Sequence, residues 1–174
     1  HLAAAHDIVR DSDTVVVLSG DHPLINADII SALLTTHSAA GAGATVMTVE
    51  LDEPGAYGRI VRDDAGDIEG IVETKDPAGV PADVLAIHEV NTGTYAFAAE
   101  PLVECLDRLE NDNSAGEYYL GDVLPMLREQ GLRVAAHKAT DPNVNLGVNN
   151  RADLARVTAE ARHHILERHM LAGV

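Results

Sequence analysis

The chain has 174 residues, 46% of them hydrophobic, which suits one globular domain with its own core. It carries 28 acidic and 12 basic residues, a formal net charge of -16, and this excludes nucleic acid and anionic membranes as main partners. The single cysteine, Cys105, excludes an internal disulfide, fits a cytoplasmic location and is expected to fill core space on a helix. No apolar stretch reaches membrane-spanning length.

Strand and helix patterns alternate along the chain, which predicts an α/β fold. Apolar residues at 14–18 predict a strand buried on both faces, and Asn26 is placed to cap a helix over 26–40. The other predicted strands are 44–51, 59–62, 67–73, 89–98 and 132–137. The other predicted helices are 1–9, 101–109, 118–130 and 153–171, the last amphipathic through Leu154, Val157, Ala161 and Ile165. We expect a mixed, mostly parallel sheet with helices on both faces and an inserted β-hairpin.

The turn Ser19-Gly20-Asp21 directly follows the first predicted strand. In open α/β sheets, ligands bind outside the carboxyl ends of the strands. Gly20 lets the backbone approach a ligand closely, and Pro23 prevents the strand from continuing. Asp21 is therefore a candidate metal or phosphate residue, and a plain acidic turn between strand and helix is the alternative.

Two patterns near the hairpin could bind a sugar phosphate. Gly58 can present its backbone at close range, and the next residue, Arg59, is either a phosphate ligand or a structural base. Glu73 can accept hydrogen bonds from sugar hydroxyls, and Lys75 can reach a phosphate. A solvated charged loop is the alternative for the second pattern.

Asparagines complete the set of candidate residues. Asn91 and Gly93 interrupt an apolar strand, which favours a β-bulge that faces a ligand or is simply structural. Asn149 offers an amide oxygen of the kind that Mg²⁺ accepts beside a carboxylate, or it caps the last helix. The nine histidines show no zinc-binding spacing, and His163 and His164 are expected on a helix surface.

Six motifs, taken in order, resemble the uridyltransferase domain of bacterial bifunctional N-acetylglucosamine-1-phosphate uridyltransferase / glucosamine-1-phosphate acetyltransferase. They are Gly20-Asp21-x-Pro23-Leu24, Gly55-x-Tyr57-Gly58-Arg59-Ile60, Ile71-Val72-Glu73-x-Lys75-Asp76, Glu89-Val90-Asn91-Thr92-Gly93, Gly116-Glu117-Tyr118-Tyr119-Leu120-x-Asp122 and Gly147-Val148-Asn149-Asn150-Arg151. The resemblance covers essentially the whole chain. One such motif is weak evidence, whereas six in the same order are specific.

The resemblance implies a Rossmann-like nucleotide-diphospho-sugar transferase fold, with residues 1–174 as a single, partial uridyltransferase domain. The implied reaction is Mg²⁺-dependent uridylyl transfer from UTP to N-acetylglucosamine 1-phosphate, giving UDP-N-acetylglucosamine and pyrophosphate for peptidoglycan and lipopolysaccharide precursors. The family's Gly-rich loop and base-reading segment would precede His1, and its β-helix acetyltransferase domain, which would form a homotrimer in the cytoplasm, would follow Val174.

The resemblance also assigns roles to individual residues. Asp21 and Asn149 are the implied catalytic pair that holds Mg²⁺. The backbone at Gly58 and the side chains of Glu73 and Asn91 are expected to contact the N-acetylglucosamine moiety. The full set of expected substrate-binding residues is Ser19, Gly20, Asp21, Gly58, Glu73, Asn91 and Asn149.

Two residues depart from the family pattern, because His22 stands where a small apolar residue is usual and Gly121 where Thr is usual. Three other functions remain open. One is another sugar-1-phosphate nucleotidyltransferase, and a second is a non-catalytic remnant or regulatory domain of the same fold. The third is a metal-dependent glycosyltransferase, against which Ser19 counts because it replaces the first acid of an Asp-x-Asp motif.

Overall fold

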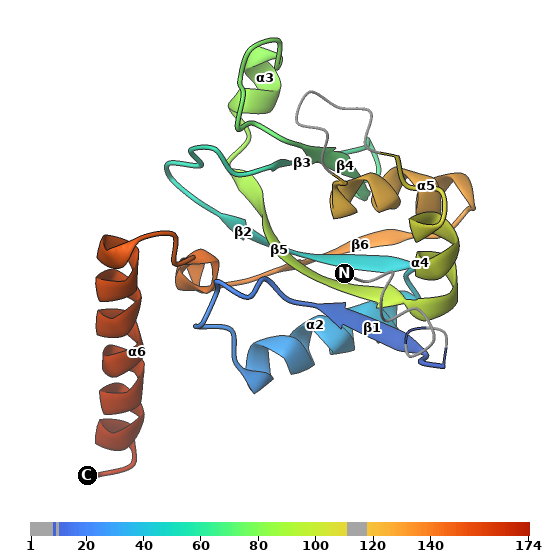
Figure 1. The fold of residues 1–174 in the computed structure, drawn as a ribbon. Helices are drawn as coiled ribbons and strands as arrows, with labels where there is room; N and C mark the ends of the chain where they lie inside the picture. Colours follow the sequence, from blue (N-terminus) through green and yellow to red (C-terminus); the bar gives the residue numbers. More distant parts are fainter. Residues whose placement is uncertain (1–8, 10, 111–117) are drawn as a thin grey trace.

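Figure 1 shows the fold in a computed structural model, which describes residue 9, residues 11–110 and residues 118–174. A six-stranded sheet is built from β1 (Thr14–Val17), β2 (Ala44–Glu50), β3 (Arg59–Arg62), β4 (Ile68–Val72), β5 (Glu89–Ala98) and β6 (Val134–Lys138). The helices are α2 (Ala27–Ala40), α3 (Ala82–Leu85), α4 (Ala99–Leu106), α5 (Val123–Glu129) and α6 (Arg151–Leu171), with 3-10 turns η2 (Leu120–Asp122) and η3 (Pro142–Asn145). The helix predicted over 1–9 lies outside the described residues, except for Val9.

The neighbouring strands are mainly antiparallel, so the expectation of a mostly parallel sheet is wrong. The strand order is β4-β3-β5-β2-β6, with β1 also paired to β5. Within the described ranges, β2 and β6 form the only parallel pair. The reason is the position of β5, which runs against β1, β2 and β3 and separates strands that share a direction. The predicted hairpin is confirmed as β3 and β4.

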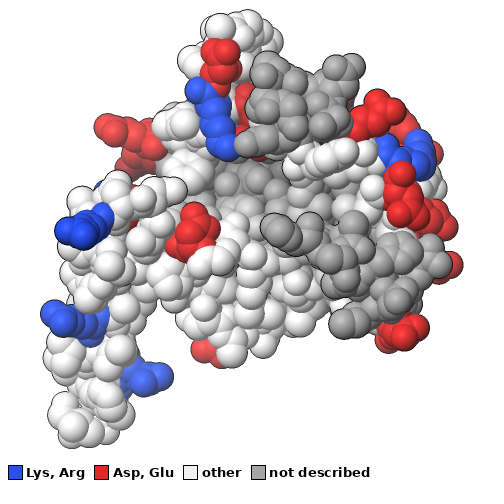
Figure 2. Space-filling view, in the orientation of Figure 1, with Lys and Arg blue, Asp and Glu red and all other residues white. Residues whose placement is uncertain are grey.

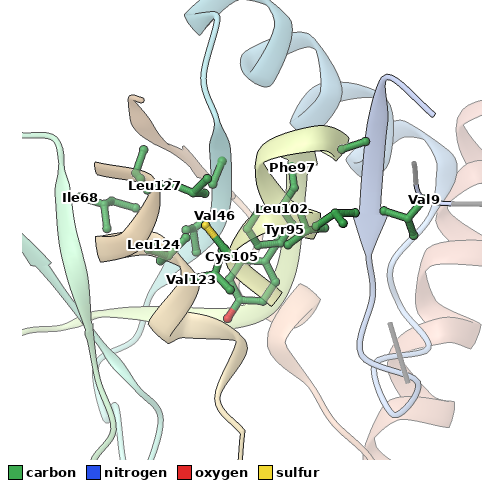
Figure 3. Close-up of a cluster of buried hydrophobic side chains, with 14 of the residues drawn as sticks. Val9, Val46, Ile68, Tyr95, Phe97, Leu102, Cys105, Val123, Leu124 and Leu127 are labelled. Atoms are coloured by element: carbon green, nitrogen blue, oxygen red, sulfur yellow. The ribbon is translucent and has the colours of Figure 1, made fainter. Parts of the chain in front are cut away.

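Helices cover both faces of the sheet, as predicted. Side chains alternate between the two faces of a strand, so Val46 joins the larger core under α4 and α5, while its neighbour Met47 joins a smaller core under α2. Figure 3 shows Phe97, Leu102 and Leu124 in the larger core. Cys105 is fully buried there on α4, which confirms its predicted place.

Helix α2 follows its sequence signals closely. The Asn26 side chain caps it by accepting hydrogen bonds from the backbone N–H groups of Asp28 and Ile29, and Gly41 ends it in the left-handed conformation with φ 54°. In contrast, the helix predicted over 118–130 divides into η2 and α5, and α3 is a short helix that the sequence patterns do not predict.

Helix α6 projects away from the sheet (Figure 1), and the apolar face predicted for it is not buried by the described residues. Val157 is buried, whereas Leu154 is 52% and Ile165 is 49% exposed. An apolar stripe indicates that a face can be buried, and it does not specify the surface that buries it. No helix in the described part of the chain is long and apolar enough to cross a membrane.

Two histidines sit between α2 and the sheet. His37 Nδ1 lies 2.9 Å from the Thr45 hydroxyl, and His137 Nδ1 lies 2.8 Å from the Thr36 hydroxyl. Burial lowers the pKa of both imidazoles below their ordinary value of 6.5.

We expect the free energy of unfolding to fall as pH drops below 6.5, the ordinary value at which both histidines titrate in the unfolded chain. Above that pH the imidazoles are neutral in both states, and the stability is intact. Below it the unfolded chain binds protons first, so stability decreases until pH passes the lowered folded pKa values. Urea denaturation between about pH 7.5 and pH 5.5 measures this slope. A His37→Gln, His137→Gln double variant with an unchanged slope would exclude these histidines as the cause.

Candidate functional site

The turn after β1 and the segment before α6 are in direct contact. The Ser19 carbonyl closes the turn by accepting the His22 N–H at 3.3 Å, and this leaves the Asp21 side chain exposed. The Asp21 carbonyl in turn accepts the Val148 N–H at 2.9 Å. This hydrogen bond places Asp21 beside the segment that carries Asn149, although the two residues are far apart in the sequence.

The side chains of Asp21 and His22 pack closely against the Gly147 backbone. A Cβ atom at Gly147 would stand 3.3 Å from Asp21 Oδ2 and 2.9 Å from His22 Nε2. A side chain at this position would therefore displace both groups, and glycine lets the turn after β1 approach the segment before α6.

Asn149 is not the helix cap. The Asn150 side chain caps α6 by accepting hydrogen bonds from the N–H groups of Ala152 and Asp153. Asn149 donates its backbone N–H to Asp153 Oδ2 at 3.1 Å. Capping is therefore done without the side chain of Asn149, which is an exposed residue one position after the Val148 that contacts Asp21.

The strand β5 carries the predicted bulge, which is confirmed by a register shift against β2. Gly93 adopts φ 73°, and its N–H donates to Asn91 Oδ1 at 2.9 Å. Asn91 Nδ2 donates to the Tyr95 hydroxyl at 2.7 Å. The Tyr95 hydroxyl therefore helps to fix the orientation of the Asn91 amide. The sequence analysis missed this role, because an aromatic residue in a strand pattern predicts only a place in the core.

Gly58 brings the hairpin entry against β5. Its carbonyl accepts the Asn91 N–H at 2.9 Å. A Cβ at Gly58 would stand 2.7 Å from Ile71 Cγ2 and 3.2 Å from Glu73 Oε1. The bare backbone therefore allows the Glu73 carboxylate to approach.

Four hydrogen bonds join these segments into a closed circuit, which we call the site ring: residues 19–21, 57–58, 91–93 and 145–149. Val148 donates to Asp21, and the Tyr57 hydroxyl donates to the Asn145 carbonyl at 3.3 Å. Asn91 donates to Gly58, and the Ser19 hydroxyl donates to the Gly93 carbonyl at 3.3 Å. With Glu73 against Gly58, the ring brings together every residue predicted to bind substrate.

Two residues at the site ring, Glu73 and Tyr95, have pKa values above their ordinary values. Burial raises the pKa of Glu73, the positive charge of Lys75 opposes this shift, and the negative charge of Asp122 adds to it. Burial raises the pKa of Tyr95 to about 12, the hydrogen bond from Asn91 opposes the shift, and Glu73 adds to it. On the face drawn in Figure 2, basic side chains lie along α6 and also at the top and at the right of the body, where acidic side chains lie beside them.

For Arg59 the sequence predicted either a phosphate ligand or a structural base, and in the structure Arg59 has a structural role. It is 4% exposed and donates to the carbonyls of Tyr57 and Gly55 and to the Thr74 hydroxyl. These bonds hold the hairpin entry in place, so the guanidinium is occupied by protein groups. The described residues contain no cluster of three or more His, Cys, Asp or Glu side chains that could hold a metal.

Comparison with known proteins agrees with this geometry. The nucleotidyl transferase family matches residues 2–142. The chain belongs to this family. Bifunctional protein GlmU of Shouchella clausii is 44% identical over 171 residues, and the GlmU proteins of Bacillus cytotoxicus and Geobacter sulfurreducens are 42% identical. Each match covers 98% of this chain and 35% to 37% of the relative, so the chain spans little more than a third of their length.

One solved structure supports the fold. A Bacillus anthracis protein, provisionally named a glucose-1-phosphate thymidylyltransferase and crystallised with sucrose, superposes with a TM-score of 0.66. The alignment covers 92% of this chain and 59% of that one at 22% identity. This likeness confirms the predicted nucleotide-sugar transferase fold.

We expect Gly58→Ala to lower the free energy of unfolding by about 1–3 kcal/mol, because the new methyl group would overlap Ile71 and crowd Glu73. Gly70→Ala is the matched control, since a Cβ at Gly70 meets nothing within 4 Å. Urea denaturation of both variants tests the difference. Equal stability of the two variants would contradict the close approach at Gly58.

Proposed function

We propose that the chain is the part of a uridyltransferase that binds sugar and metal, and that it acts on UTP and N-acetylglucosamine 1-phosphate. The products would be UDP-N-acetylglucosamine and pyrophosphate, which supply peptidoglycan and lipopolysaccharide precursors. The observation that carries the proposal is the site ring, because the ring, with Glu73 against Gly58, contains the residues that five of the six sequence motifs would assign to substrate and metal. The identity of 42% to 44% to GlmU proteins adds support.

In this proposal Asp21 and Asn149 hold Mg²⁺. Both offer hard oxygen donors, and the hydrogen bond from the Val148 N–H to the Asp21 carbonyl holds their two segments together. When bound, the ion would neutralise phosphate charge during transfer. Residues 19–21 would position the nucleotide phosphates, with backbone groups near Gly20 close to the ligand.

The N-acetylglucosamine moiety would bind at the opposite side of the site ring. Its contacts would be the side chain of Asn91, the backbone of Gly58 and the side chain of Glu73, which lies against Gly58. Carboxylate and amide groups match the donors of sugar hydroxyls and the polar N-acetyl group. This placement would direct the sugar phosphate oxygen at the α-phosphorus of UTP. A phosphate oxygen is already ionised at neutral pH, so the proposal requires positioning and charge neutralisation and no general base.

The resemblance also leads us to propose a cytoplasmic location, which the single cysteine fits. We propose a homotrimer for a longer protein that contains the β-helix domain of the family. Both proposals concern the whole protein, of which this chain matches a part.

Asp21→Ala should abolish uridylyl transfer. The chain can replace the 171 matching residues of the Shouchella clausii relative, and pyrophosphate release from UTP and N-acetylglucosamine 1-phosphate then reports turnover. We expect kcat to fall about 10²-fold or more, because the metal-binding carboxylate is lost. Asp64→Ala, at an exposed turn of the hairpin, is the control and should keep full activity. Near-normal turnover of Asp21→Ala would refute the metal assignment, and turnover only with another nucleotide or sugar phosphate would refute the substrate assignment.

Glu73→Gln should raise KM for the sugar phosphate in the same chimera by about tenfold, with little change in kcat. The amide keeps the size of the side chain and loses one acceptor for sugar hydroxyls. KM for UTP serves as the internal control and should stay constant. A rise in KM for UTP alone would place Glu73 at the nucleotide instead of the sugar.

A further inference from the structure

The side-chain amide of Asn91 is held at both of its ends. The backbone N–H of Gly93 donates to Asn91 Oδ1 at 2.9 Å, and Asn91 Nδ2 donates to the Tyr95 hydroxyl at 2.7 Å. A backbone N–H can only donate, so the end of the amide that faces Gly93 is the oxygen. The nitrogen then faces the Tyr95 hydroxyl, which can accept. The plane of the amide and its polarity are both set by groups of the chain itself.

Tyr95 is a rigid anchor for this amide. The residue is 4% exposed, and its ring stacks on Phe97 with the ring centroids 5.5 Å apart (Figure 3). Its backbone pairs with Val17 of β1 and Val46 of β2 on the two sides of β5. Burial raises the pKa of Tyr95 to about 12, so the hydroxyl keeps its proton at neutral pH. A hydroxyl on a ring packed in this way has a fixed position, and its hydrogen bond transmits that order to Asn91.

Each end of the Asn91 amide keeps one further hydrogen-bonding position. An amide oxygen can accept two hydrogen bonds and an amide nitrogen can donate two, whereas Gly93 and Tyr95 each use one. Asn91 is half-buried, so its side chain is not enclosed by the core. One donor and one acceptor at fixed places are suited to the hydroxyl and N-acetyl groups of a sugar.

We propose that Tyr95 is a positioning residue for sugar binding, because its hydroxyl keeps the Asn91 amide in the orientation that receives N-acetylglucosamine 1-phosphate. This inference deepens the proposed function, on which it rests for Asn91 as a sugar ligand. Tyr95 acts through Asn91 and does not touch the sugar. An amide that is ordered in advance loses less conformational freedom when the ligand binds, so the affinity for the sugar phosphate depends on a hydroxyl in the core.

Tyr95→Phe removes the hydroxyl and keeps the ring that stacks on Phe97. In the chimera with the Shouchella clausii relative, we expect KM for N-acetylglucosamine 1-phosphate to rise about threefold to tenfold, the scale of one lost hydrogen bond. The values of kcat and of KM for UTP should change by less than about twofold. Thr45→Val is the matched control, since it removes a buried hydroxyl outside the site ring, 2.9 Å from His37 Nδ1. The control should leave KM for the sugar phosphate unchanged even where it lowers stability.

A double-mutant cycle separates positioning from direct contact. Asn91→Ala removes the amide that Tyr95 holds, so adding Tyr95→Phe to it should change KM for the sugar phosphate by less than about twofold. If the Tyr95 hydroxyl contacted the sugar itself, the two effects would multiply. Effects that multiply, or an unchanged KM in folded Tyr95→Phe, would overturn the inference.

The order of the amide can be measured without enzyme activity. In nitrogen-15 NMR spectra of the 174-residue chain, the two Nδ2 protons of Asn91 give a pair of signals that Asn91→Ala removes. We expect these protons to exchange with water about threefold faster or more in Tyr95→Phe, and equal rates would also overturn the inference.

The two proposals can fail separately. Faster exchange in Tyr95→Phe beside an inactive chimera would refute the proposed function and leave Tyr95 as the anchor of Asn91. An active chimera with unchanged KM in Tyr95→Phe would refute only the inference.

Discussion

The site depends on four hydrogen bonds that close the site ring. Two of these bonds adjoin paired strands, β3 with β5 at Gly58 and Asn91, and β1 with β5 at Ser19 and Gly93. The bond from Val148 to Asp21 brings together the two segments that carry the proposed metal ligands. Two of the four bonds run between backbone groups, and in the other two a hydroxyl of Tyr57 or Ser19 is the donor. Gly147, Gly58 and Gly93 stand at three of the four junctions, where a Cβ would enter the space of a neighbouring group.

Strand β5 explains why the junctions fall where they do. Its residues 95–98 pair with β1, while Val90 pairs with Arg59 of β3. Between these partners, residues 92–94 bulge against β2 and have no strand on their other side among the described residues. The Gly93 carbonyl there accepts the Ser19 hydroxyl of the turn after β1, and the Asn91 amide is held by Gly93 and Tyr95. The pairing of β5 with β1, β2 and β3 therefore accounts both for the antiparallel sheet and for the position of the site ring.

Local signals in the sequence were sufficient for much of this structure. The N-cap at Asn26, the hairpin, the bulge near Gly93 and the extent of β5 follow from turn chemistry, capping and side-chain patterns. Strand direction was not predictable in the same way, because a pattern of strands and helices does not specify which strands become neighbours. The positioning role of Tyr95 was also invisible, since it depends on the course of the bulge. The apolar face of α6 shows the same limit, because its partner is not defined by the helix itself.

The acidic character of the chain sets a condition on any phosphate ligand. A net charge of -16 opposes the approach of a nucleotide, and the guanidinium of Arg59, next to Gly58 of the site ring, already donates to backbone carbonyls and to Thr74. A divalent cation at Asp21 would supply positive charge locally, without a basic surface. In the proposed function, the sugar hydroxyls would need acceptors, and half-buried Glu73 would be one of them. Cation binding at Asp21 and hydroxyl binding at Glu73 would then let a strongly acidic chain recognise a sugar phosphate.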